Sequence, residues 1–416
     1  MSKSIINFYR RAYSGLPGPA WTLFAVQLVN ASGMMVLFFL SLYLTRRLGY
    51  TLSQAGRAIS IFGMGSLAGS FLGGWLSDRI GSTNVQKLSL FFSGVFFIWL
   101  GQLREPWSVN GMLFILALSS GMLFPANSTS MARLCPPDIT TKGFALNRLA
   151  GNIGATIGPA VGGFLALHDY GLLFWADGLT CLAAVVVFSL LWKKPEQTLR
   201  ASTAEQTPSR RSPWRDPPFL MLLPMIVLWG SIFFQLIATF PLYMREVYGL
   251  AENRIGQLIM INTLLIIALE MILMQAIRKN PATRYIALSF VLTGAGFGLM
   301  PLGRGFLFAA LTVTVWTFGE MLSMPLLGAL IARRAGPGSQ GRYMGMISFA
   351  YSLSMILGPA VGTTIYGRLG PAALWFGCGG AGILLYAAFS LLAPSLAEEA
   401  SPSDSGQDRR PVSPLD

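Results

Sequence analysis

Two glutamates lie inside long apolar stretches of the sequence, where an ionisable group could carry protons. Glu320 stands in VWTFGEMLSMP and Glu270 in LLIIALEMILMQ, and neither stretch contains a basic residue. An ionised carboxylate inside a bilayer is costly, so intramembrane acids are rare and usually functional. An acid that binds a proton in one state and releases it in another couples transport to a proton gradient. We therefore expect both to be proton-coupling residues; the alternative is that they stay protonated and only form hydrogen bonds within the protein.

Further polar and aromatic residues in the apolar stretches could line a cavity for a small molecule. Hydrogen bonding between helices explains a buried amide equally well, so both interpretations stay open for each residue. The candidates are Gln27, Asn30, Asn127, Asn152, Trp229, Gln235, Asn262 and Trp316. Two charged residues are interpreted differently: Asp177 as a helix-start residue near the outer surface, and Arg148 as a side chain that reaches out to the membrane surface.

Other chemistry is not indicated by the sequence. A single histidine and three widely separated cysteines match no metal spacing and no disulfide framework. The TGAGFG run at 293–298 lies in an apolar stretch with no preceding strand, so it does not predict a nucleotide-binding loop. We expect neither enzyme activity nor a cofactor, with a proton gradient as the source of energy.

The composition predicts that most of the chain does not face water. Of the 416 residues, 53% are hydrophobic and 11% charged, whereas soluble domains contain about 25% charged residues. The net charge is +13, but the basic residues are scattered singly and in pairs between apolar stretches. This pattern is typical of the flanks of membrane spans and argues against a nucleic-acid partner. The expected partners are the lipid bilayer, protons and a small-molecule substrate.

Apolar stretches of about 20 residues, the length that crosses a bilayer core, recur along the chain. We predict an all-α membrane protein with twelve transmembrane helices. These lie at 20–44, 55–76, 87–103, 109–132, 144–167, 170–192, 217–241, 255–277, 284–303, 306–331, 343–366 and 371–393. Both termini are expected in the cytoplasm, because most of the 30 lysines and arginines then fall on that side.

The sequence also contains an internal repeat with an offset of 200 residues. GPAVG occurs at 158–162 and again at 358–362, and in the same register Gly56 returns as Gly256. Duplicated halves in transporters usually enclose a cavity near the midplane, which opens to alternate sides. The predicted organisation is an N-terminal six-helix half (1–192), a cytoplasmic linker (193–216), a C-terminal six-helix half (217–393) and a disordered cytoplasmic tail (394–416).

The loop after the second predicted span reads GGWLSDRIGSTNVQK. It resembles the loop between spans 2 and 3 of the major facilitator superfamily, whose pattern is G-x-x-x-D-R-x-G-R-R. The matching residues are Gly74, Asp78, Arg79 and Gly81. Ser82 and Thr83 stand in place of the final basic pair. The resemblance implies that the aspartate is a gate residue that latches the two halves on the cytoplasmic side, with Arg133 and Arg342 as its expected partners.

A second motif lies in the fifth predicted span, where GATIGPAVGG resembles G-x-x-x-G-P-x-x-G-G of the antiporter branch of that superfamily. The matching residues are Gly154, Gly158, Pro159, Gly162 and Gly163. Small residues at intervals of four line one face of a helix, where another backbone can approach closely. This face is either a static packing surface or an interface along which the halves move.

The resemblance extends over the whole chain and is nearest to the twelve-span drug:proton antiporters. It implies proton-driven export of small amphipathic molecules, such as drugs, siderophores or dipeptides, by a monomer in the bacterial inner membrane. One feature departs from this pattern, since antiporters of this kind usually have an arginine in span 4 and none occurs between Arg104 and Arg133. The alternatives are a solute:proton symporter on the same fold and, with less support, a non-transporting membrane receptor.

Overall fold

The computed structural model describes residues 15–135, 139–192, 212–277, 281–335 and 339–398, and every regular element in these ranges is a helix. The N-terminal half contains α2 (Gly18–Ser32), α3 (Val36–Leu42), η1 (Tyr43–Arg47), α4 (Leu52–Leu76), η2 (Ser77–Gly81), α5 (Ser82–Leu100), α6 (Pro106–Gly121), α7 (Leu123–Leu134), α8 (Thr140–His168) and α9 (Gly171–Leu191). The C-terminal half contains η3 (Pro213–Arg215), α10 (Pro217–Phe233), α11 (Gln235–Ala238), α12 (Phe240–Glu246), α13 (Glu252–Ile277), α14 (Ala282–Gly298), η4 (Met300–Leu302), α15 (Phe306–Ala335), α16 (Gln340–Leu369) and α17 (Pro371–Glu398).

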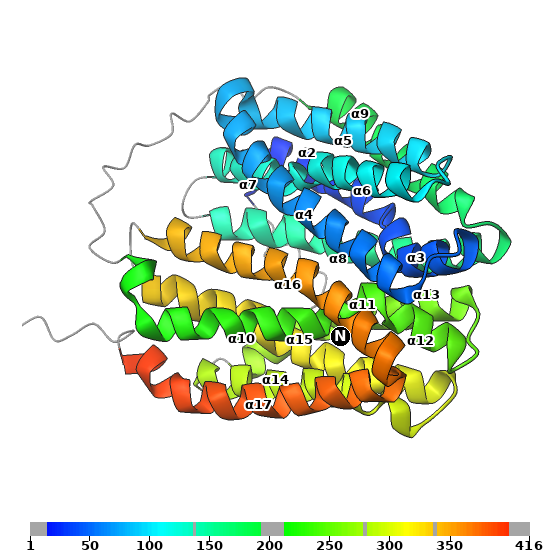
Figure 1. Ribbon diagram of the computed structural model, residues 1–416. Coiled ribbons are helices and arrows are strands. Elements are labelled where there is room, and N and C mark those ends of the chain that lie inside the picture. Colours follow the sequence, from blue (N-terminus) through cyan, green and yellow to red (C-terminus); the bar gives the residue numbers. More distant parts are fainter. Residues whose placement is uncertain (1–14, 136–138, 193–211, 278–280, 336–338, 399–416) are drawn as a thin grey trace, which may run out of the picture.

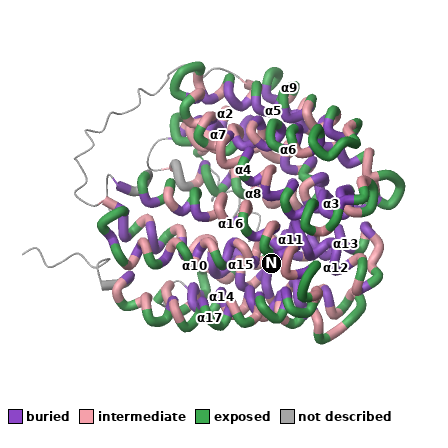
Figure 2. Tube along the Cα trace, in the orientation of Figure 1, coloured by how far each residue is buried: buried purple, intermediate pink, exposed green. Residues whose placement is uncertain are grey.

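The two halves lie side by side, with their long helices running between two common ends (Figure 1). We call the end where η2 and η3 lie the linker end, because the described chain stops at Trp192 and resumes at Ser212 there. The other is the opposite end. Buried residues concentrate between the helices, and exposed ones follow the outer surfaces (Figure 2). This pattern fits a membrane protein, whose outward-facing surfaces are apolar as well.

Eleven segments in the described part of the chain are long and apolar enough to cross a membrane. One of them, Leu52–Leu100, has 49 residues and contains both α4 and α5. The chain turns back between these helices (Figure 1), at Gly81 with φ +87°, a conformation that costs glycine little. Within the described residues, the structure therefore gives eleven such segments rather than the predicted twelve spans. The number becomes twelve when α4 and α5 are counted as two spans.

The predicted boundaries of the linker and the tail need correction. Helix α17 continues to Glu398, so the tail predicted to begin at 394 starts inside a helix. Residues 212–216 are also ordered, because Pro213–Arg215 form a helical turn and the next residue caps α10. The remainder of both predicted segments, 193–211 and 399–416, lies outside the described residues.

The repeat seen in the sequence is also present in the structure. Gly49 and Gly249 both end the first long segment of their half, with φ of +70° and +67°. That segment is broken in both halves, into α2 and α3 in one and into α10, α11 and α12 in the other. The same backbone devices therefore recur at the same register, as a duplicated unit requires.

The two most extensive contacts between the halves, called seams here, are α4 against α16 and α8 against α13; α3 also contacts α11 and α12. On one seam, a Cβ added to Gly56 would lie 2.8 Å from the carbonyl oxygen of Pro359. On the other, a Cβ added to Gly256 would overlap the carbonyl oxygen of Pro159. The proline carbonyl of each GPAVG copy therefore packs against a glycine of the other half: Pro359 against Gly56, and Pro159 against Gly256. Both contacts lie toward the opposite end.

A buried ion pair fixes the start of the C-terminal half. Asp216 accepts hydrogen bonds from Arg334 Nε at 2.7 Å and Nη2 at 2.6 Å, and one from Tyr343 at 2.9 Å. It also accepts from the backbone N–H of Phe219 and so caps α10. Burial opposes ionisation of Asp216, but these hydrogen bonds outweigh it and hold its pKa below the ordinary value. The pair therefore ties α10 to α15 and α16.

Replacing Arg334 by methionine is expected to destabilise the protein by about 3–5 kcal/mol, because it leaves the buried Asp216 charge uncompensated. The additional change Asp216→Asn should recover much of the loss. The carboxylate stabilises the fold fully above its unfolded-state pKa, and this contribution disappears as the pH falls through the lower folded-state pKa. Thermal unfolding in detergent at pH 7 measures the effect; Arg333→Met, an exposed neighbour, is the control and should change little.

Candidate functional site

A cavity of about 720 Å³ lies in the N-terminal half and brings several of the predicted polar residues together. Four of them line it: Gln27, Asn30, Asn127 and Asn152. The amide nitrogen of Asn127 donates to Asn147 Oδ1 at 2.9 Å, while its own Oδ1 is buried without a hydrogen-bond partner among the described residues. A buried acceptor without a donor is costly. This oxygen is covered in the conformation described here, so a ligand N–H or O–H would reach it only after the Asn127 side chain turns toward the cavity.

The apolar part of the same cavity comes from residues on five helices of the N-terminal half. They include Leu37, Phe62, Leu90, Phe97, Phe124 and Phe144. Met355 of α16 closes the cavity from the C-terminal half. The cavity therefore combines an aromatic and aliphatic surface with a few convergent polar groups, which is the usual composition of a small-molecule site.

Asp177 was expected near the outer surface but lies fully buried, as the seventh residue of α9. Its carboxylate accepts hydrogen bonds from the backbone N–H groups of Met35 at 3.1 Å and Val36 at 2.9 Å. These groups begin α3 and have no partner in their own helix, because α2 ends at Ser32. Asp177 thus caps the break in the first long segment and shapes one wall of the cavity.

Glu320 lies on α15, where Asn262 of α13 donates to its Oε2 at 2.9 Å. The same amide group donates to Thr317 Oγ1 at 3.0 Å. Asn262 therefore links Glu320 and Thr317 within the C-terminal half, and it does not line the 720 Å³ cavity. The carboxylate is held by a neutral donor, without a basic residue in hydrogen-bonding contact.

Glu270, the second predicted acid, has a cationic partner that the sequence did not predict. Arg148 of α8 forms a hydrogen-bonded ion pair with it, across the boundary between the halves. The glutamate side chain is 11% exposed and the arginine side chain 48%. Arg148 therefore points inward to the facing half, rather than out to the membrane surface. It also lines the cavity, which places the ion pair at the edge of the candidate binding site.

Three predicted cavity residues pack inside the C-terminal half instead. Trp229 and Trp316 are fully buried, and Phe233 packs between them. Gln235 donates to the Gly358 carbonyl oxygen at 2.8 Å and accepts from Thr239, so it joins α11 to α16. None of the three lines the 720 Å³ cavity. Their contacts in this conformation are those of core residues.

The predicted gate residues lie at the linker end and are only partly brought together. Asp78 approaches Arg133 of its own half at 3.8 Å, with side chains 79% and 53% exposed. Such an exposed pair stabilises a protein by at most about 1 kcal/mol. Arg342, the other expected partner, is exposed at the start of α16 and forms no ion pair with Asp78 in the described part of the chain. Arg79 stacks on Trp75 at 4.0 Å.

The glycines of the second motif pack closely against other residues, mostly within their own half. Cβ atoms added to Gly154, Gly158 and Gly162 would meet residues at the break between α2 and α3. Gly163 instead faces the other half, where an added Cβ would lie 2.6 Å from the carbonyl oxygen of Glu252. The regular face of small residues therefore packs against the first segment of its own half, and Pro159 and Gly163 form the contact between halves. In the first motif, nothing lies within 4 Å of a Cβ added to Gly74.

Polar contacts between the halves also occur at the opposite end. Tyr170 donates to Glu252 Oε1 at 2.8 Å across the boundary, and Arg245 forms an ion pair with the same oxygen at 3.5 Å. Burial, followed by the hydrogen bond to Glu252, raises the pKa of Tyr170, so the phenol remains a donor. The halves are thus joined at this end, whereas Phe71 on the linker-end part of α4 is 68% exposed.

Comparisons with known proteins agree with this architecture. A family model described as Major Facilitator Superfamily matches residues 22–359. The Na(+), Li(+), K(+)/H(+) antiporter of Planococcus maritimus is 25% identical, over 86% of this chain and 89% of its own length. The multidrug resistance protein MdtH of Edwardsiella ictaluri is 23% identical, over 80% of this chain and 83% of its own.

The fold is also found among solved structures. A crystal structure of the peptide transporter POT in complex with sulfate matches with a TM-score of 0.78 at 18% identity, and the match covers 93% of this chain and 96% of that one. At this identity the likeness establishes the arrangement of helices and says nothing of the substrate. The curated relatives are transporters, and their matches span most of both chains.

Proposed function

Since the chain belongs to the major facilitator superfamily, we propose that it is a secondary active transporter that exports small amphipathic molecules in exchange for protons. It would act without a cofactor or enzymatic step, as a monomer in a bacterial inner membrane. Both termini and the linker end would face the cytoplasm, as the distribution of basic residues predicts. The names of two relatives, a cation/proton antiporter and a multidrug resistance protein, support this class of activity.

The observation that carries the proposal is that the two predicted acids, both in the C-terminal half, have different partners. Glu270 is held by Arg148 of the other half, whereas the side-chain donor to Glu320 among the described residues is the neutral amide of Asn262. A carboxylate with a neutral donor loses little when it is protonated, while one paired to arginine gives up an ion pair. The two acids therefore suit different roles. Glu320 binds the transported proton, and Glu270 forms an ion pair whose presence depends on how the two halves are positioned.

The proposed cycle uses the contacts of the two ends. In the conformation described here the halves meet at the opposite end, and substrate enters the cavity from the linker end. Rocking of the halves then separates α8 from α13 at the opposite end and opens the cavity outward, where Glu320 is protonated and substrate leaves. Closure at the linker end brings Asp78 toward Arg342, as the family motif implies. Return to the first conformation releases the proton inside.

Transport by purified protein in liposomes tests the proposal. A proton gradient, alkaline on the side of the linker end, should drive substrate toward the acidic side, and substrate flux should move protons the other way. A growth comparison of a deletion strain across toxic compounds supplies the substrates to use. Accumulation of a solute on the same side as the protons would identify a symporter instead, and the absence of any coupled flux would refute the proposal.

Asn127 lines the cavity, and we propose that its side chain turns so that the unsatisfied carbonyl oxygen accepts a hydrogen bond from the substrate. Asn127→Leu is expected to raise the KM about fivefold for a substrate that donates a hydrogen bond there, since such a bond contributes about 1 kcal/mol. A rhodamine ester with primary amines and its tetra-N-methyl counterpart form a suitable pair of transported dyes. The substitution should raise the KM of the primary-amine dye selectively; an equal change for both dyes would show that Asn127 only supports the fold.

A further inference from the structure

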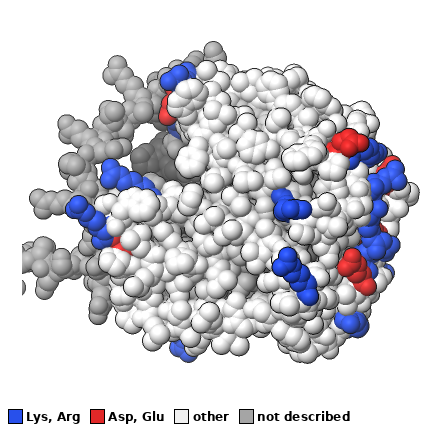
Figure 3. All heavy atoms as spheres, in the orientation of Figure 1, with Lys and Arg blue, Asp and Glu red and all other residues white. Residues whose placement is uncertain are grey.

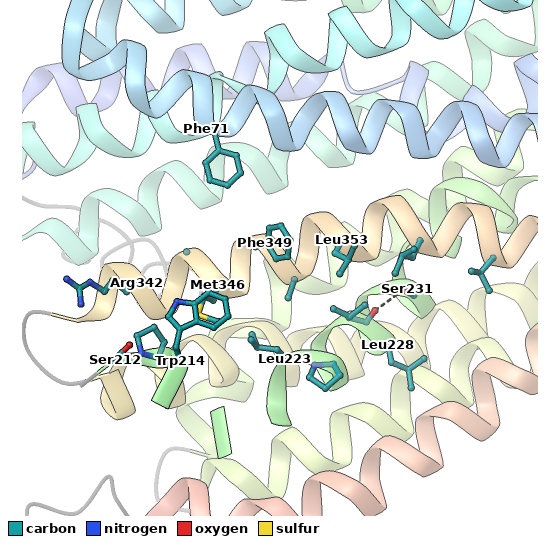
Figure 4. A pocket seen from close by; sticks show the side chains of 17 residues that line it. Phe71, Ser212, Trp214, Leu223, Leu228, Ser231, Arg342, Met346, Phe349 and Leu353 are labelled. Atoms are coloured by element: carbon teal, nitrogen blue, oxygen red, sulfur yellow. Dashed lines mark hydrogen bonds between the residues drawn. The ribbon is translucent and has the colours of Figure 1, made fainter. Parts of the chain in front are cut away.

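A second and larger hollow lies apart from the 720 Å³ cavity, lined mainly by the C-terminal half and by one residue of the N-terminal half. It has a volume of about 1130 Å³ and runs between α10 and α16, with η3 at the linker end (Figure 4). Its walls are mostly apolar, with Leu223 and Leu228 on α10 and Met346, Phe349 and Leu353 on α16. We call this hollow the α10–α16 groove. It shares no lining residue with the 720 Å³ cavity.

The groove is open to the surroundings of the protein. Phe349, Leu357 and Val361 are 49%, 41% and 53% exposed, and they line it along α16. From Arg342 to Val361, α16 rises about 28 Å, close to the thickness of a bilayer core. The surface over α10 and the linker-end part of α16 is uncharged in Figure 3, with basic side chains at its border. Lipid chains are therefore the medium that this groove meets.

The linker end of the groove has a different character. Arg342, Trp214 and Ser212 lie together there, at the mouth of the apolar channel (Figure 4). Trp214 is 72% exposed, and tryptophan side chains favour the level of the lipid headgroups. Arg342 is exposed as well, and it forms no ion pair with an acid in the described ranges. The mouth thus presents a cation and hydrogen-bond donors at the depth where phosphates lie.

This combination fits a molecule with an anionic head and a long apolar chain. The undescribed segments of this chain fit less well, since 1–14 and 193–211 each contain more basic than acidic residues and would be repelled by Arg342. Residues 399–416 are acidic but contain no apolar stretch that could fill the channel. We propose that the α10–α16 groove binds an anionic phospholipid, with its phosphate at Arg342 and one acyl chain between Phe349 and Leu357.

The bound lipid would also touch the N-terminal half. Phe71 of α4 is the one lining residue from that half, and it faces Phe349 across the groove (Figure 4). Helices α4 and α16 contact each other toward the opposite end, but they are separated here, nearer the linker end. The acyl chain therefore occupies the space into which α4 moves when the linker end closes, and anionic lipid favours the conformation described here.

Photo-crosslinking in vesicles tests the site directly. The full-length protein is reconstituted into phosphatidylethanolamine vesicles that contain a minor fraction of a diazirine-labelled phosphatidylglycerol or of the matching phosphatidylcholine. Labelled peptides are mapped by mass spectrometry. Phosphatidylglycerol should label residues 342–361 about fivefold more than phosphatidylcholine, the ratio that about 1 kcal/mol from one basic residue gives.

Two pairs of variants separate the headgroup from the acyl chain. Arg342→Gln should remove the preference for phosphatidylglycerol, while Arg333→Gln, the same change of charge at the same end, should retain it. Gly345 lines the groove and has nothing within 4 Å of an added Cβ, so Gly345→Leu introduces an apolar side chain at the channel wall. It should reduce labelling by both lipids, and Gly377→Leu, equally unobstructed on α17, should not.

Three outcomes would overturn the proposal. One is equal labelling of residues 342–361 by the two lipids in the unmodified protein. Another is an equal loss of preference in Arg333→Gln and Arg342→Gln. The third is labelling of other outward-facing helices but not of α16, which would show that the linker or a second copy of the chain covers the groove. None of these readouts depends on transport, so the proposed function and the lipid site fail or succeed separately.

Discussion

Replacement of Glu320 by glutamine is expected to abolish proton-coupled transport and leave the protein folded. Glutamine has nearly the same shape, and its carbonyl oxygen still accepts the hydrogen bond from Asn262. The variant cannot bind and release a proton at this position. The change between the two conformations is then no longer driven by the proton gradient. We expect the coupled rate to fall by about two to four orders of magnitude, the range attributed to a lost proton-transfer group.

The measurement compares substrate flux in liposomes with and without an imposed proton gradient. Downhill exchange of substrate should persist in Glu320→Gln, because the cavity and the seams between the halves are unchanged. Glu105→Gln, an exposed acid outside the membrane spans, is the matched control and should transport as the unmodified protein does. A wild-type gradient-driven rate in Glu320→Gln would remove this residue from the mechanism.

The same assay separates the two acids. Glu270→Gln leaves Arg148 without its carboxylate partner, so both coupling and the balance between the two conformations should change. The double variant Arg148→Gln with Glu270→Gln removes both charges and should recover conformational exchange more than proton coupling. Two acids with interchangeable effects would contradict the separate roles that their partners indicate.

The sequence was sufficient to predict most of the architecture. Apolar stretches of bilayer length predicted nearly every helix, and the repeat of GPAVG predicted two related halves. These features are local in the sequence or depend on simple comparison, so no spatial information is needed. The count of spans differed only where α4 and α5 are joined by a short helical turn that ends at Gly81. The sequence had already separated these two helices, as the predicted spans 55–76 and 87–103, because the loop between them is polar.

The site was predicted less completely, because its important contacts join residues far apart in the sequence. Glu270 appeared to lack a basic partner within its own span, yet Arg148, 122 positions away, supplies one from the other half. The available signal was that Arg148 is the only basic residue inside the apolar stretch 144–167. Asp177 was misplaced for the same reason, since the break in α2 and α3 that it caps is not visible from its own surroundings.

The type of a polar residue was also not sufficient to predict whether it lines the cavity or packs in the core. Asn127 and Gln235 are both buried amides in broken or kinked regions, but one lines the cavity and the other joins two helices. The difference depends on which face of the helix each residue occupies after folding. The tryptophans follow the same rule: Trp229 and Trp316 pack on Phe233 in the interior, where a large aromatic surface is buried effectively.

Replacement of Gly256 by leucine is expected to stop transport by preventing closure at the opposite end. An added side chain would overlap the Pro159 carbonyl oxygen and lie 3.1 Å or less from that carbonyl group, which is backbone and has little room to move. The α8–α13 seam would then separate, and the conformation that opens outward would be favoured. We expect substrate flux to fall at least about a hundredfold, which corresponds to a bias of about 2.7 kcal/mol against the closed state.

A cysteine at Ser60 reports whether the halves move as bodies. Ser60 is buried on the other seam, where its hydroxyl donates to the Ile356 carbonyl oxygen at 2.6 Å. The native cysteines Cys135, Cys181 and Cys378 are buried, so a membrane-impermeant maleimide should react with Ser60→Cys mainly when that seam opens. Gly256→Leu should accelerate this reaction, and Gly328→Leu, where an added Cβ meets nothing within 4 Å, should not. If Gly256→Leu stops transport but does not speed up the labelling of Ser60→Cys, the leucine disturbs only the α8–α13 seam. The two seams would then not open together.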